Sequence, residues 1–202
     1  MDYPDYKAKI TSHWLQLGIG PREAAAKLQA ACGDIELDEE TIRKLEARWL
    51  QKHDALSIVY GILAGPWNRL AGFDCEDVVS PADHTFIVTY LGATTANKFV
   101  AENAVQSFEP NGDLRLSLTH EGKPYAFTFE DGGSWLNLSG LLVGLNRALE
   151  ELHIPERFIE LYAGDGPGVV AFVLPNEFLS AARELGIQLE LRFGPAGSSG
   201  QR

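Results

Sequence analysis

Few of the side chains that could carry out chemistry stand at the spacing that known chemistries need. The two cysteines, Cys32 and Cys75, lie far apart, which favours reduced thiols over a zinc or redox motif and leaves one disulfide open. The five histidines have no second histidine or cysteine at metal-ligand spacing; they are His13, His53, His84, His120 and His153. The sequence therefore predicts no metal site and no cofactor.

Two short segments have the composition of a binding loop but lack its pattern. The segment "DCED" at residues 74–77 places three acids around Cys75. The glycine and the spacing of a calcium-binding loop are missing, so a solvated acidic loop is favoured. The segment "GDGPG" at residues 164–168 lies between two expected strands, and Pro167 lacks the amide that would hold a phosphate. It is expected to be a hairpin turn.

Signatures of enzymes are also missing. The chain has no Gly-x-Ser-x-Gly segment and no Gly-Lys-Ser/Thr phosphate loop. A cysteine and a histidine that meet in space, such as Cys75 with His84 or His120, leave an enzyme with a non-motif site as an alternative. The sequence favours a protein that is not an enzyme, without deciding the question.

The segment "EDGGSW" at residues 130–135 combines acids, glycines, a hydroxyl and a tryptophan between an expected strand and an expected helix. Its glycines allow the positive φ angles of a tight turn. Ser134 or Asn137 is expected to cap the helix, and Asp131 lies near the positive end of the helix dipole. Trp135 then remains, either as cover for the core, its commoner place, or as an exposed binding anchor.

The elements that must position these residues begin with a helical N-terminal third. Apolar residues recur at helical spacing in residues 5–17 and 24–31. Asp38 is expected to cap a third helix, and the apolar face of that helix extends as far as Leu63.

The second and third of these helices faintly resemble a helix-turn-helix, which would make the protein a DNA-binding regulator. The would-be recognition helix begins with the acids "DEE", which would face phosphates with like charge. A plain helical hairpin is therefore preferred, and the regulator remains an alternative. Its basic face would consist of Arg43, Lys44, Arg48 and Lys52.

From His84 onward the pattern changes to that of strands and helices in alternation. The segment His84–Leu91 is rich in β-branched and aromatic residues, which favours a strand. Residues 98–130 indicate an antiparallel meander with a hairpin at "EPNGD". The later segments are predicted as a helix over 138–152, strands over 157–163 and 169–174, a helix over 175–185 and a strand over 187–193.

Together these elements predict an α+β fold, with a helical N-terminal third followed by a largely antiparallel mixed sheet with packed helices. The expected division is a helical subdomain over residues 1–66 and an α+β domain over residues 67–193. The small polar residues of 194–202 are expected to form a disordered tail.

The charge balance bears on the class of partner. The chain has 28 acids against 17 bases, a net charge of −11, and residues 67–202 hold 18 of the acids and 9 of the bases. An acidic field of this kind repels nucleic acid and anionic lipid surfaces, and it either suits a basic protein partner or only keeps the chain soluble. No secretory signal and no long apolar run is found, so a cytoplasmic protein is expected.

An acidic α+β pattern without catalytic motifs resembles the immunity proteins of bacterial polymorphic toxin systems. The resemblance is carried by "NGDLRLSLTHEGKPYAFTFEDGGSWLNLSGLLVGLNRALEEL" and by the strand–turn–strand segment "RFIELYAGDGPGVVAFVLP", and it covers roughly residues 98–191. It implies that the protein neutralises a cognate toxin by occluding its active site, with acidic groups meeting a basic surface.

The first hypothesis is therefore a protein-binding domain with a basic partner, which would be a toxin domain if the resemblance holds. The expected partner-binding residues are Asp131, Trp135 and Asp165, two acids and a tryptophan that lie in loops. An enzyme with a non-motif site and a helix-turn-helix-like regulator are the two alternatives.

Overall fold

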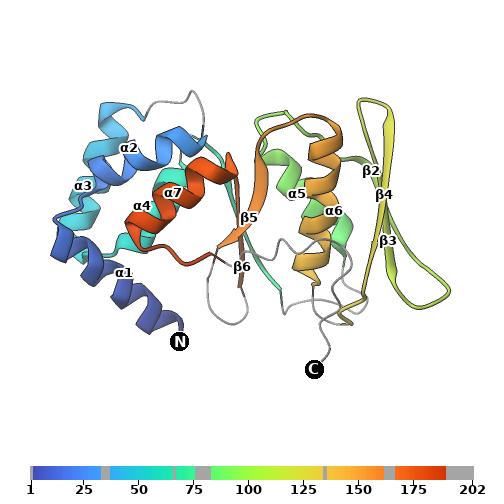
Figure 1. Cartoon of the computed structure of the whole chain (residues 1–202), viewed down its shortest axis with the longest axis horizontal. Helices are drawn as coiled ribbons and strands as arrows, with labels where there is room; N and C mark the ends of the chain where they lie inside the picture. The colour runs from blue at the N-terminus through green and yellow to red at the C-terminus, as the bar shows by residue number, and fades with distance from the viewer. Residues whose placement is uncertain are drawn as a thin grey trace.

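The computed structural model describes residues 2–32, 37–65, 67–75, 83–133, 136–161 and 167–189. It confirms an α+β fold, and its N-terminal third is helical (Figure 1). The four helices of this part are α1 (Tyr3–Leu17), α2 (Pro21–Cys32), α3 (Glu39–Lys52) and α4 (Ala55–Ala64).

The third and fourth helices were expected to be one helix, and this expectation is wrong. His53 takes a left-handed backbone conformation with φ of 44°, which ends α3, and its amide donates to the carbonyl of Trp49. Asp54 then caps α4 by accepting from the amide of Ser57 at 3.1 Å. The apolar spacing continues across the break because both helices bury residues in the same core, such as Leu45 and Leu56.

A three-stranded antiparallel sheet lies at the centre of the molecule. It consists of β1 (Leu70–Asp74), β5 (Arg157–Leu161) and β6 (Pro167–Val173) in the order β1-β6-β5. The expectation of a buried central strand after the "GDGPG" segment is confirmed by β6. No strand was expected at β1, because this short stretch contains a glycine and shows no strict alternation.

The apolar run of β6 is explained by cores on both faces of this sheet. Val169, Ala171 and Val173 belong to the core that the N-terminal helices cover. Val170 and Phe172 belong to a second core on the opposite face. Successive side chains of a strand point to opposite faces, so a strand buried on both sides must be apolar throughout.

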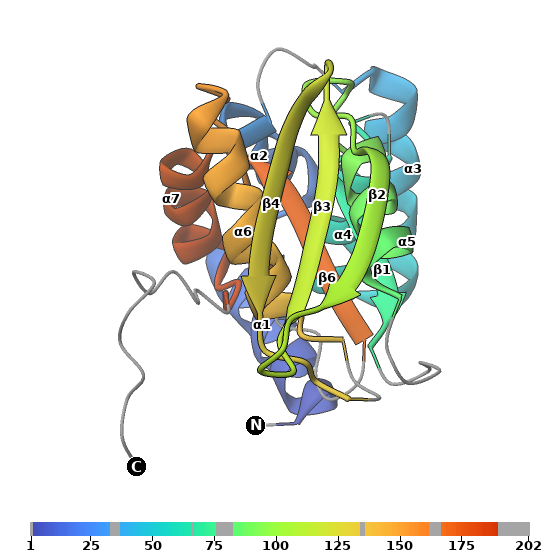
Figure 2. The ribbon, with the colours of Figure 1, turned by 90° about the vertical axis from the view of Figure 1, so that its right-hand side faces the viewer.

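A second antiparallel sheet lies at the far side of the molecule. Its order is β2 (Glu102–Phe108), β3 (Leu114–His120) and β4 (Lys123–Phe129), which confirms the expected meander (Figure 2). The turn between β3 and β4 has two residues, Glu121 and Gly122, both with positive φ. One face of this sheet, with Leu114, Leu116 and Leu118, closes the second core.

Two helices, α5 (His84–Ala93) and α6 (Leu138–Glu151), fill the space between the two sheets (Figure 1). The helix expected over residues 138–152 is confirmed by α6, and Asn137 caps it by accepting from the amide of Gly140. The strand expected at His84–Leu91 is wrong, since this segment is α5. Its buried residues, among them Ile87 and Leu91, stand four apart, so packing on one face outweighs the strand preference of the side chains.

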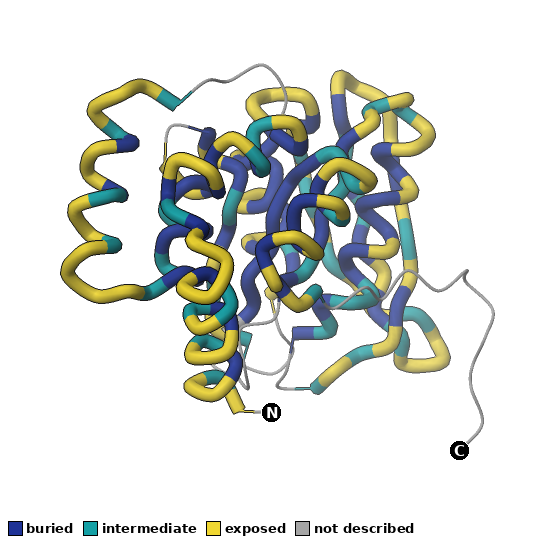
Figure 3. Tube along the Cα trace, turned by 60° about the vertical axis from the view of Figure 1, so that its left-hand side comes forward, coloured by how far each residue is buried: buried dark blue, intermediate teal, exposed yellow. Residues whose placement is uncertain are grey.

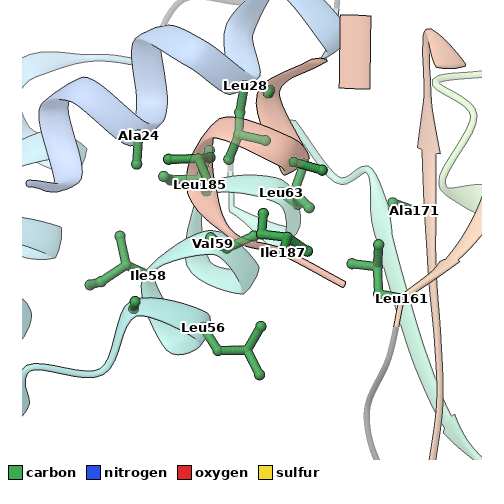
Figure 4. Packing of buried hydrophobic residues seen from close by; sticks show 14 of the residues in the cluster. Ala24, Leu28, Leu56, Ile58, Val59, Leu63, Leu161, Ala171, Leu185 and Ile187 are labelled. Carbon is green, nitrogen blue, oxygen red and sulfur yellow. The ribbon is translucent and has the colours of Figure 1, made fainter. Parts of the chain in front are cut away.

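The last helix, α7 (Pro175–Leu185), lies against α2 and ends at Gly186 in the left-handed conformation, as expected. Its residues share one core with α1–α4 and with β5 and β6. Figure 4 labels members of this core from α2, α4, α7, β5 and β6. The division into domains at residues 66 and 67 stays a prediction. Of the strand expected over 187–193, Leu189 forms a bridge with Leu161, and residues 190–193 and the tail lie outside the described residues.

No disulfide joins Cys32 and Cys75, so the bond that the sequence left open does not form. Within the described ranges, none of the helices has the length and apolar character needed to cross a membrane. The helices at the outside of the molecule bury one side and expose the other (Figure 3).

Candidate protein-binding surface

The end of the outer sheet at which β2 and β4 finish brings several expected and unexpected residues together. Both strands run downward in Figure 2 and finish at the same end of the sheet, which is called the edge below. The N-terminus of α5 lies at this edge too, because the backbone amide of His84 donates to the side chain of Gln106 at 3.1 Å. This end of the sheet is therefore formed by three elements, α5, β2 and β4.

Large aromatic side chains are exposed at this edge. Phe86, in the first turn of α5, is 65% exposed, and Phe108, at the end of β2, is 52% exposed. Tyr90 lies one helical turn further along α5. Its ring stacks on the ring of Phe86, with 6.3 Å between the two ring centroids. Phe108 lies two residues beyond Gln106, which is about 7 Å along a strand, so the two phenylalanines fit within one interface.

Carboxylates lie at the same end of the outer sheet as these aromatic side chains. Arg115 pairs with one of them, Glu109, at 3.2 Å. The carboxylates come from the N-cap of α5, the β2–β3 turn and the segment after β4, and they are Asp83, Glu109, Asp113, Glu130 and Asp131. We call the set of Phe86, Tyr90, Phe108 and these five acids the acidic–aromatic surface.

Asp83 is the carboxylate whose ionisation the structure controls most directly. It accepts from the hydroxyl of Thr85 and from the amides of Thr85 and Phe86. The hydrogen bond from the Thr85 hydroxyl, followed by the backbone hydrogen bonds, holds the pKa of Asp83 below its usual range against the opposing effect of burial. Asp83 therefore stays negatively charged at neutral pH.

The expected partner-binding residues are placed only in part. Asp131 is half-buried, belongs to the acidic–aromatic surface, and accepts from the amide of Gly133 at 3.0 Å, so one of its roles is to shape the turn after β4. Trp135 and Asp165 lie outside the described residues. Phe86 and Phe108 were not among the expected binding residues. Phe108 could have been noticed, because it directly precedes the "EPNGD" turn, and the ends of strands beside turns are often exposed.

The Cys32 thiol and the two histidines considered for catalysis, His84 and His120, are buried in the fold. Burial raises the pKa of the Cys32 thiol to about 12, so this thiol remains neutral. The His84 ring packs on Phe129 at 5.1 Å, and the His120 ring stacks on Phe99 at 5.3 Å. In the part of the chain that the structure describes, no group of three or more histidine, cysteine or acidic side chains is arranged to hold a metal ion.

No protein-family model matches the chain, and no curated protein or solved structure matches it either.

Proposed function

We propose that this protein is a protein-binding domain that holds a basic partner on its acidic–aromatic surface. The observation that carries the proposal is the exposure of Phe86 and Phe108 at an edge lined with carboxylates. When a partner covers an exposed phenylalanine, the apolar surface of its ring is removed from water, and this contributes to the affinity. The carboxylates around it steer a basic partner and set its orientation.

The proposal includes the role expected from the resemblance to immunity proteins. In that role the domain acts in the bacterial cytoplasm and covers the active site of a cognate toxin. A surface that combines aromatic anchors with an excess of acids fits a basic, nucleic-acid-directed toxin face, because such a face is positively charged. The same surface would serve another basic partner equally well, so the partner's identity is left to experiment.

The test is a capture experiment from native lysate at low salt with the wild-type chain and three single variants. Phe86→Ser and Phe108→Ser remove the aromatic anchors, and Leu50→Ser is the matched control, since Leu50 is 73% exposed but lies on α3. We expect one basic protein that is retained by the wild type and by Leu50→Ser and is lost with either phenylalanine variant. Salt should release this protein, because exposed charges are screened.

Two results would contradict the proposal. One is a partner that the Phe86→Ser and Phe108→Ser variants retain as well as the wild type does, which would place the interface elsewhere. The other is the absence of any captured basic protein from lysates of cells that carry the neighbouring genes. Thermal unfolding of each variant shows whether a lost partner reflects the surface or a loss of folding.

A further inference from the structure

A cleft on the helical side of the molecule has a charge opposite to that of the whole chain. It lies between α1, the end of α3 and α4, and comprises two adjoining hollows of about 630 Å³ and about 530 Å³. Lys7, Lys52 and Asp54 line both hollows, so they form the ridge between them, and Arg48 lines the smaller one. We call this region the α1–α3–α4 cleft.

The single carboxylate shared by both hollows is already used by the protein. One oxygen of Asp54 accepts from the amide of Ser57 at 3.1 Å and caps α4, and the other pairs with Lys7 at 2.6 Å. Arg48 and Lys52 form no ion pair with any carboxylate of the described residues. The cleft therefore has two positive charges that are not neutralised, in a chain whose net charge is −11.

Three other bases of the N-terminal helices, by contrast, are paired with carboxylates. Arg22 pairs with Glu39 at 2.6 Å, Lys27 with Glu184 at 2.6 Å, and Lys44 with Glu40 at 2.7 Å. Lys44 precedes Arg48 by one helical turn on α3. A base of this helix can therefore pair with a carboxylate of the same helix, whereas Arg48 and Lys52 at the cleft do not. Of the three bases that line the cleft, Lys7 pairs with Asp54, and Arg48 and Lys52 form no ion pair with the described residues.

Neutral hydrogen-bond donors complete the lining of the smaller hollow. The side chains of Tyr3, Ser57 and Tyr60 line it together with the bases. Burial, reinforced by the nearby Tyr3 and Tyr6, raises the pKa of Tyr60, so its phenol keeps its proton at neutral pH. Gly61 adds no side chain to the lining.

We propose that the α1–α3–α4 cleft binds a small molecule that carries phosphate groups. The guanidinium of Arg48 offers two parallel N–H donors that match two phosphate oxygens, and the ammonium of Lys52 adds a further positive charge from the next turn of α3. A hollow of about 530 Å³ has the volume of sites for small metabolites. The aromatic rings beside it provide an apolar surface for the rest of such a molecule.

The site is separate from the acidic–aromatic surface, which belongs to α5 and the outer sheet. Phosphate binding can therefore succeed or fail without any bearing on the partner interaction. Arg48 and Lys52 are also two of the four bases of the DNA-binding face that the regulator alternative requires. Binding of a small phosphate compound would give these two bases a role other than contact with a DNA backbone.

Isothermal titration calorimetry with pyrophosphate at low salt tests the proposal on the full-length chain. We expect saturable binding to the wild type that becomes about ten-fold weaker in Arg48→Gln and in Lys52→Gln, because each loses a charged hydrogen bond to the anion. Lys44→Gln is the matched control. It removes the same charge from the same helix outside the cleft, and it should bind pyrophosphate as the wild type does.

Four results would overturn the proposal, and the last of them concerns a non-phosphate anion. The first is no saturable heat with pyrophosphate, and the second is an equal loss of affinity in Lys44→Gln, which would indicate attraction to the surface in general. The third is a DNA duplex that binds more tightly than pyrophosphate and depends on Arg48 and Lys52, which would assign these bases to a nucleic-acid backbone. Citrate serves as a non-phosphate anion, and citrate binding as tight as that of pyrophosphate would exclude phosphate selectivity.

Discussion

At the scale of single residues, Asn146 on α6 has a role that resembles that of a neighbouring strand. The strand β5 lies at the edge of the central sheet, and among the described residues the outer side of its backbone pairs with another segment only at the Leu161–Leu189 bridge. The side chain of Asn146 donates to the carbonyl of Phe158 at 2.9 Å and accepts from its amide at 2.8 Å. Asn146 is 8% exposed, so its amide group satisfies two backbone groups that water does not reach.

Replacement of Asn146 should therefore be costly. In Asn146→Ala both groups of Phe158 lose their partner, and at about 1–2 kcal/mol for each buried group the free energy of unfolding should fall by about 2–4 kcal/mol. Urea unfolding followed by circular dichroism measures this change. The exposed Asn176→Ala at the start of α7 is the control and should change stability by less than about 1 kcal/mol. Equal effects of the two variants would show that the Asn146 hydrogen bonds contribute nothing.

Residues that cap a helix could be predicted from the sequence, and the exposure of Phe86 and Phe108 could not. Asp38 was predicted as a helix cap, and Asn137 as one of two candidate caps beside Ser134, because a cap depends only on the three or four residues that follow it. Phe86 is exposed because α5 turns one face toward the second core and the other toward solvent. That outcome depends on packing between distant segments, which the spacing of residues in a short window does not contain.

At the scale of elements, α5 shows how a cap can decide between a helix and a strand. Its β-branched and aromatic residues favour a strand, yet the segment folds as a helix that starts directly after Asp83. Three groups, the amides of Thr85 and Phe86 and the hydroxyl of Thr85, donate to this one carboxylate. The cap supplies the hydrogen bonds that a helix start otherwise lacks, and so offsets a weak helix propensity.

We expect Asp83→Ala to destabilise the protein at neutral pH by about 1 kcal/mol, the usual effect of losing a helix cap. The pKa of Asp83 is lowered in the folded state, so its contribution to stability is present above the pKa of the unfolded chain. It is lost as the pH falls through the lowered folded pKa. The stability difference between wild type and variant should therefore be full near pH 7 and shrink below about pH 4.

Thermal unfolding at a series of pH values measures this difference. Asp5→Ala on α1 serves as the control, since Asp5 is an exposed acid that donates its backbone amide to the Asp2 cap and is not itself the capping group. A difference for Asp83→Ala that stays constant from pH 7 to pH 3 would show that the carboxylate does not act through its charge.

Elements that are regular over many residues were predicted well, and short or interrupted ones were not. The meander and α6 were predicted because alternation and helical spacing persist through each of them. The break between α3 and α4 was missed because a single residue in the left-handed conformation causes it while the buried face continues. The strand β1 was missed because its pairing with β6 spans about half of the chain.

At the scale of the whole molecule, the central sheet joins two cores that share no helix. The N-terminal helices and α7 cover one face, and α5, α6 and the outer sheet cover the other (Figure 1). The strand β6 contributes alternate residues to both. Loss of either core would expose one apolar face of this strand to water, which links the stability of one core to that of the other.

This link predicts a single cooperative unfolding transition, in contrast to the two that separate domains over residues 1–66 and 67–193 would show. Leu28→Ala removes a buried side chain from the first core and Leu145→Ala one from the second. Each should lower the unfolding free energy by about 2–5 kcal/mol and shift the whole transition, whether tryptophan fluorescence or far-ultraviolet circular dichroism follows it. If Leu28→Ala shifted only part of a two-step transition, the helices would unfold on their own, and the sequence-based division at residue 66 would describe real domains. Because β6 is buried on both faces, we expect the single transition.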